Sequence, residues 1–117
     1  YTPTWLHLFK NLPIREYTIL MDLCACMMGN SSSAVREATF IGTPAVNIGS
    51  RQNSRLKGAN IIDVDYDADE IVRAVKTQLN NNERKSDSLY GDGTASKRIA
   101  ETIASLKEVK VQKTICY

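Results

Sequence analysis

The feature that most constrains the fold is a short apolar run that ends in a polar turn and continues as a helix. The run is Cys24–Met28, and it stops at Gly29-Asn30. A continuous apolar run of this length is typical of a strand buried on both faces, as in a parallel sheet. Ser31–Ser33 then offer hydroxyl caps for a helix over Ala34–Ile41, which Gly42 would end. The segment therefore predicts strand, turn and helix in an α/β fold.

The rest of the chain continues this alternation of helices and short apolar runs. Apolar residues at helical spacing predict a helix over Ile14–Leu23, before the run. Two further short strands are expected at Ala45–Ile48 and Asn60–Val64. A capping box then predicts a helix over about Ala68–Leu79, and Thr94 is expected to cap a last helix. Strands that alternate with helices predict a parallel sheet with right-handed crossovers.

Composition and charge exclude several classes of protein. The 117 residues are 43% apolar and 24% charged, which is ordinary for a soluble domain and argues against disorder. A formal net charge of +2 is too small to indicate a nucleic-acid partner or an anionic membrane surface. No apolar run reaches the roughly 18 residues of a membrane span, and three cysteines do not make a disulfide framework. We therefore expect one compact, cytoplasmic domain.

The polar turn is the strongest candidate for a binding site. Parallel sheets bind ligands beyond the carboxyl ends of their strands, and a helix N-terminus there offers N–H groups to phosphate. Ser31 and Ser32 would add hydroxyl donors. With Ser33 as the cap, Glu37 lies one turn further on and could accept both hydroxyls of a ribose. Arg51 follows the next strand and could face a phosphate or a base.

Each of these residues also has a purely structural interpretation. The serines could only cap the helix, Glu37 could only complement the helix dipole, and Arg51 could be a solvated loop residue. Arg55 and Lys57, in the same loop, are expected to be solvated. What favours a site is that three separate features meet at one edge of the sheet.

Other polar groups give weaker signals. Cys24 and Cys26 would share one face of a strand, but a metal needs about four ligands and the chain has one histidine, His7. We therefore expect no metal and no cofactor. Tyr90-Gly-Asp-Gly93 is interpreted as a turn before the last helix.

Three motifs resemble one known family in their order and spacing. They are Gly29-Asn-Ser-Ser-Ser-Ala-Val-Arg-Glu37, Gly42-Thr-Pro-Ala-Val-Asn-Ile-Gly-Ser-Arg-Gln52 and Tyr90-Gly-Asp-Gly93. They are similar to the C-terminal half of the UDP-N-acetylglucosamine 2-epimerases, particularly the hydrolysing branch of sialic-acid-type sugar biosynthesis. The resemblance implies a Rossmann-like three-layer parallel sheet, as in the C-terminal domain of a GT-B fold. Residues 1–117 would be the UDP-binding domain, without the N-terminal catalytic half.

The resemblance also implies a role for individual residues. Ser31 and Ser32 would hold the diphosphate, and Glu37 would take the ribose hydroxyls. Arg51 would be a further UDP contact, and the backbone at Leu12 would meet the uracil edge.

The family reaction eliminates UDP to a glycal, to which water adds to give N-acetylmannosamine. Its acid, base and histidine belong to the N-terminal half, so the resemblance implies no catalytic residue here and no activity of the chain alone. The implied partners are the UDP-sugar and the missing N-terminal domain, in a homo-oligomer at full length. Two alternatives stay open: a nucleotide-sugar-binding domain of a GT-B glycosyltransferase, and a non-catalytic nucleotide-binding module.

Overall fold

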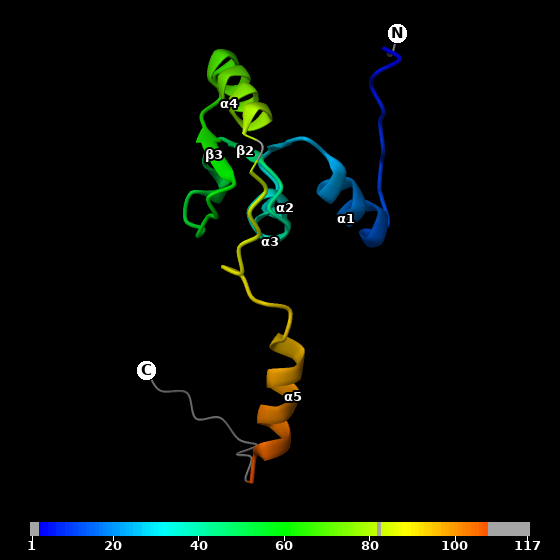
Figure 1. Cartoon of the computed structure of the whole chain (residues 1–117), viewed down its shortest axis with the longest axis vertical. Helices are drawn as coiled ribbons and strands as arrows, with labels where there is room; N and C mark the ends of the chain where they lie inside the picture. Colours follow the sequence, from blue (N-terminus) through cyan, green and yellow to red (C-terminus); the bar gives the residue numbers. More distant parts are fainter. Residues whose placement is uncertain (1–2, 82, 108–117) are drawn as a thin grey trace, which may run out of the picture.

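The computed structural model describes residues 3–81 and 83–107 and shows a three-stranded parallel sheet with helices against it (Figure 1). The strands β1 (Met27–Gly29), β2 (Ala45–Ile48) and β3 (Ile61–Val64) lie side by side in chain order. Both strand pairs are parallel, so the carboxyl ends of all three strands lie at the same edge. The predicted α/β fold with an open parallel sheet is confirmed.

The central strand carries the core of the sheet. Ala45, Val46 and Asn47 of β2 are all fully buried. Because successive residues of a strand point to opposite faces, β2 is covered on both faces, as a three-layer arrangement requires. The helix α2 (Ser32–Val35) contacts β1 and β2, whereas α4 (Ala68–Asn80) contacts β2 and β3.

The first strand is shorter and more exposed than the sequence predicted. We expected a doubly buried strand over Cys24–Met28, but Cys24 and Cys26 precede β1 in irregular chain, and Met28 is 66% exposed. The reason is that β1 is an edge strand, since no other strand of the described residues pairs with its outer side. An apolar run in this sequence therefore predicted the strand but not its burial.

The helix after the polar turn is interrupted, which corrects the single helix expected over Ala34–Ile41. It consists of α2 and of α3 (Glu37–Ile41), with Arg36 between them at φ −98° and ψ −67°. The Thr39 hydroxyl donates to the Val35 carbonyl at 2.7 Å. A hydroxyl that bonds four residues back in this way bends a helix. Gly42 ends α3 at φ +86°, as predicted.

The other helices begin close to where the sequence placed them. The helix α1 has the predicted bounds, Ile14–Leu23. The side chain of Asp67 caps α4 by accepting the Glu70 N–H at 2.8 Å. Thr94 precedes α5 (Ala95–Ser105) as expected, but it forms no side-chain cap. Its hydroxyl donates instead to the carboxylate of Asp92, at 2.7 Å.

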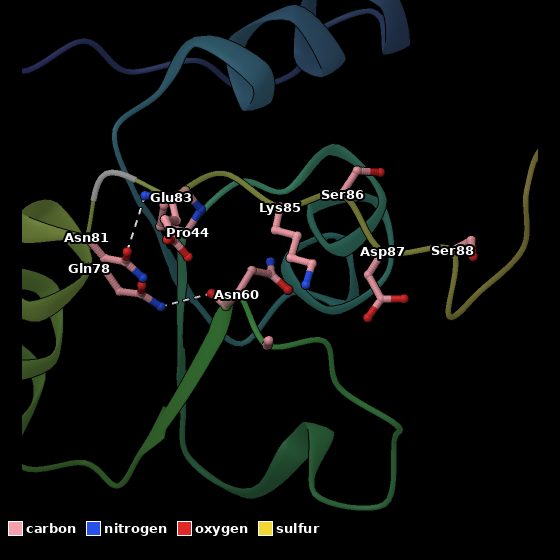
Figure 2. A pocket seen from close by; sticks show the side chains of 10 residues that line it. Pro44, Asn60, Gln78, Asn81, Glu83, Lys85, Ser86, Asp87 and Ser88 are labelled. Carbon is pink, nitrogen blue, oxygen red and sulfur yellow. Dashed lines mark hydrogen bonds between the residues drawn. The ribbon is translucent and has the colours of Figure 1, made fainter.

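The side-chain amides of Gln78 and Asn60 connect the elements at the amino edge of the sheet (Figure 2). Gln78 of α4 donates through Nε2 to the carbonyls of Ala45 and Asn60, both at 2.8 Å. The Asn60 amide in turn donates to the Thr43 carbonyl at 2.7 Å and accepts the Thr39 hydroxyl at 3.0 Å. A cavity of about 400 Å³ lies here, beside the segment 83–88, and none of the predicted site residues lines it.

The described chain is more extended than a single rounded domain of its length would be. The radius of gyration is 19.1 Å, whereas a compact domain of this length has one of about 13 Å. The helix α5 lies apart from the sheet and has no buried residue (Figure 1). The core is therefore confined to the sheet and the helices next to it. Within the described residues, no helix is long and apolar enough to span a membrane.

Candidate functional site

The candidate site is built around the serine turn, Asn30–Ser33, which follows β1 at the carboxyl edge of the sheet. Ser31, and not Ser33 as the sequence suggested, is the N-cap of α2, because its Oγ accepts the Ser33 N–H at 3.3 Å. Ser32 begins the helix, so its N–H has no acceptor within the helix. Since α2 has a single turn, an anion here would depend on individual N–H and O–H donors more than on a helix dipole.

The loop after β2 is tied directly to the serine turn. It begins with a 3-10 turn, η1 (Ser50–Gln52). Arg51 donates through Nη1 to the Asn30 carbonyl at 3.0 Å, and Gln52 donates through Nε2 to the same oxygen at 2.8 Å. The structure thus places Arg51 beside the serines, as the parallel topology predicted. Gln52 is the residue that the sequence reasoning missed, although it ends the second family-like motif.

Glu37 lies in different surroundings from those expected. Because the helix is interrupted at Arg36, Glu37 begins α3 and does not continue the turn that carries the serines. It lines a hollow of about 450 Å³ together with Tyr90 and Gly91, and the serines do not line this hollow. The guanidinium of Arg36 lies 6.0 Å from the centroid of the Tyr90 ring. The segment 90–93, which the sequence predicts to be a turn, therefore also forms a wall of the hollow beside Glu37.

Leu12 lies in a third place, just before α1. It is half-buried and lines a hollow of about 330 Å³ with Phe9, Asn11 and Tyr17. The five predicted site residues are therefore distributed over three surfaces. Of these five, Ser31, Ser32 and Arg51 meet at the carboxyl edge, whereas Glu37 and Leu12 each line a hollow of their own.

Lys57, which the sequence predicts to be solvated, forms an ion pair with Asp63 instead. The Lys57 ammonium lies 2.8 Å from both carboxylate oxygens of Asp63, and the buried amide of Asn47 donates to Oδ1 of Asp63 at 2.6 Å. Burial alone would raise the pKa of the Asp63 carboxyl, but the hydrogen bonds from Lys57 and Asn47 and the charge of Lys57 hold it below its usual range. The charge of Lys57 is therefore balanced by Asp63 of β3, and Arg51 is the basic residue of the loop that contacts the serine turn.

Comparison with known proteins identifies the family. The family model for UDP-N-acetylglucosamine 2-epimerase matches residues 2–104. A protein of Legionella pneumophila, named UDP-N,N'-diacetylbacillosamine 2-epimerase (hydrolyzing), is 35% identical over 85% of this chain and 26% of its own length. The UDP-N-acetylglucosamine 2-epimerase of Neisseria meningitidis is 31% identical over 81% of this chain and 26% of its own length.

A third relative matches a shorter stretch at higher identity. The GDP/UDP-N,N'-diacetylbacillosamine 2-epimerase (hydrolyzing) of Campylobacter jejuni is 50% identical over 48% of this chain and 15% of its own length. The chain spans about a quarter of the length of the first two relatives. The family model covers most of this chain, which also has the parallel sheet and the contact between the serine turn and the Arg51 loop described above. This chain therefore belongs to the UDP-N-acetylglucosamine 2-epimerase family.

Proposed function

We propose that this chain is the nucleotide-binding part of a hydrolysing UDP-N-acetylglucosamine 2-epimerase and binds UDP at the carboxyl edge of its sheet. The observation that supports this most is the double hydrogen bond from Arg51 and Gln52 to the Asn30 carbonyl. It joins a turn rich in hydroxyl and N–H donors to a permanent positive charge. A diphosphate is the anion that such a combination of donors suits.

The serine turn and Arg51 would hold the diphosphate. Ser31 uses one lone pair of its hydroxyl in the cap, which leaves the hydroxyl hydrogen for a phosphate oxygen. Ser32 offers a hydroxyl and an N–H without an intrahelical acceptor. Arg51 uses one nitrogen on the Asn30 carbonyl, so the other N–H groups of its guanidinium stay free to bind phosphate.

Glu37 and Leu12 would bind the other parts of the nucleotide. In this proposal Glu37 accepts the ribose hydroxyls from the start of α3, and the backbone at Leu12 meets the uracil edge. Their separate hollows fit this assignment, because phosphate, ribose and base occupy different parts of an extended ligand.

The chemistry would be elimination of UDP from the sugar to give a glycal, followed by addition of water to give N-acetylmannosamine. This chain would stabilise the departing UDP. Hydrogen bonds to charged groups contribute about 1.5–3 kcal/mol each, whereas enzymes lower barriers by about 8–23 kcal/mol. We therefore assign no catalytic residue to this chain and expect it to be inactive alone.

The proposal also concerns the full-length enzyme of which this chain would be a part. The catalytic carboxylates and histidine would come from an N-terminal domain, and the full-length enzyme would be a cytoplasmic homo-oligomer in sialic-acid-type sugar synthesis. The two relatives named as hydrolyzing support the hydrolysing outcome.

Isothermal titration calorimetry with UDP and UMP tests the binding proposal. We expect UDP to bind more tightly than UMP, because UMP lacks one phosphate. Ser32→Ala and Glu37→Ala should each weaken UDP binding, whereas Ser54→Ala, at an exposed serine outside the turn, should not. A folded chain that does not bind UDP at millimolar concentration would contradict the proposal. Unchanged affinity in both variants would leave the serines and Glu37 with structural roles only.

A further inference from the structure

We propose that Gln52 is a positioning residue, which fixes the peptide between Asn30 and Ser31 and thereby the direction of the Ser31 N–H. The Gln52 side chain is 2% exposed, and its Nε2 donates to the Asn30 carbonyl at 2.8 Å. The ligand that would benefit is the diphosphate, so that part of the inference rests on the proposed function. The part that concerns the geometry of the turn is independent of the proposed function.

The peptide bond transmits the effect of this hydrogen bond. The described chain has no cis peptide bond, so the carbonyl of Asn30 and the N–H of Ser31 are in a planar trans unit and point in opposite directions. When Gln52 draws the carbonyl toward the loop after β2, the Ser31 N–H is turned away from that loop. A rotation of this peptide would withdraw the N–H and present a carbonyl oxygen, which repels phosphate.

The chemistry of the two groups determines how the Gln52 amide is oriented. A carbonyl oxygen can only accept, so the amide must direct its NH₂ group toward Asn30. The same orientation leaves Oε1 of Gln52 buried and without a partner among the described residues. Gln52 thus donates to the Asn30 carbonyl although its own Oε1 is unpaired. A buried residue that only fills space does not usually carry an unpaired polar atom.

Gln52 and Arg51 would have different roles at the Asn30 carbonyl. Both donate to the Asn30 oxygen, which has two lone pairs and can accept both. Arg51 is exposed and its guanidinium can turn toward a bound phosphate, whereas Gln52 is held in the interior. Gln52 therefore keeps the peptide in place when the ligand attracts Arg51.

The chain offers a matched control at the opposite edge of the sheet. Gln78 is also a buried glutamine, 4% exposed, whose Nε2 donates to backbone carbonyls at 2.8 Å. Gln52→Met and Gln78→Met each replace a buried amide by an apolar side chain of similar length. Both variants should lose stability, but only Gln52→Met should change the serine turn.

The experiment is ¹⁵N NMR of the 117-residue chain, with calorimetry using UDP. We expect Gln52→Met to shift or broaden the amide signals of Ser31 and Ser32 and to weaken UDP binding about tenfold, if the competent peptide orientation falls to about a tenth of the population. Gln78→Met should leave both readouts as in the parent chain. If Gln52→Met does not fold, Gln52→Asn, which withdraws the donor by one methylene, is measured instead.

The two possible failures are distinguishable. If the folded Gln52 variant keeps the parent amide signals of the serine turn and the parent UDP affinity, the inference is overturned while the proposed function stands. If the parent chain does not bind UDP, the proposed function is overturned. The amide signals of Ser31 and Ser32 then still decide whether Gln52 orients the turn.

Discussion

The two edges of the parallel sheet differ in how their side-chain amides are paired. At the amino edge, Gln78 and Asn60 connect α4, β2 and β3 through hydrogen bonds to backbone carbonyls. Toward the carboxyl edge, Asn47 and Gln52 each have a buried side-chain oxygen without a partner among the described residues. Buried polar groups are normally paired, and departures from this rule concentrate at functional sites. The amides of the amino edge therefore contribute to stability, whereas in the proposed function the carboxyl edge is the part that binds a ligand.

The largest effect on stability is expected at the amino edge, from Gly42→Ala. Gly42 has φ +86°, and an added Cβ would lie 2.8 Å from the backbone carbon of Lys85. Strain of this kind costs on the order of 1–3 kcal/mol before the clash is counted. The free energy of unfolding, measured with urea, should fall by at least that amount.

Gly93→Ala is the matched control for this variant. Gly93 has a similar φ of +82°, but an added Cβ would have nothing within 4 Å. It should therefore lose less stability than Gly42→Ala. Equal losses in the two variants would show that the contact of Gly42 with the segment 83–88 does not matter.

A smaller effect, on binding and not on stability, is expected at the carboxyl edge from Arg51→Ala. Removing a charged donor from a phosphate costs about 1.5–3 kcal/mol, which corresponds to a loss of UDP affinity of about tenfold or more. Arg55→Ala removes an exposed arginine from the same loop and should change affinity little. If the two variants weaken UDP binding equally, the loop acts through its general charge and Arg51 has no specific role.

The smallest effect is expected from the Lys57–Asp63 ion pair, which should make stability depend on pH. Because the pKa of Asp63 is lowered by folding, its stabilisation is present at neutral pH and is lost as the pH falls through the folded pKa, below the ordinary value of 3.8. The Asp63 side chain is 48% exposed, so solvent screening keeps the contribution below about 1 kcal/mol.

Urea unfolding at pH 7 and pH 3 measures this contribution. Asp63→Asn should lose less stability between the two pH values than the parent chain does. An equal loss in both would mean that other carboxyl groups account for the acid sensitivity.

The sequence predicted best those features that depend on neighbours in the chain. The helix over Ile14–Leu23, the strand Ala45–Ile48 and the cap at Asp67 follow from local spacing, chain propensity and turn chemistry. The meeting of Arg51 with the serine turn also followed, because parallel strands bring their carboxyl ends together.

Features that depend on distant contacts could not be predicted in this way. The exposure of Met28 reflects the position of β1 at the edge of the sheet, and the pairing of Lys57 with Asp63 needs two segments to meet. The helix break at Arg36 separates Glu37 from the helical turn that carries the serines, on which the sequence pattern had predicted it to lie. Gln52 was missed because a polar loop residue becomes buried only when two loops close over it.

The measurement that tests the central claim most directly is a ¹H–¹⁵N NMR titration of the folded chain with UDP. If the carboxyl edge is the binding site, the amide signals of Ser31, Ser32 and Arg51 should shift with UDP and reach saturation together. The signals of Asn60 and Gln78, at the amino edge, should stay unchanged. Saturable shifts at the amino edge, with none at the serine turn, would contradict this account.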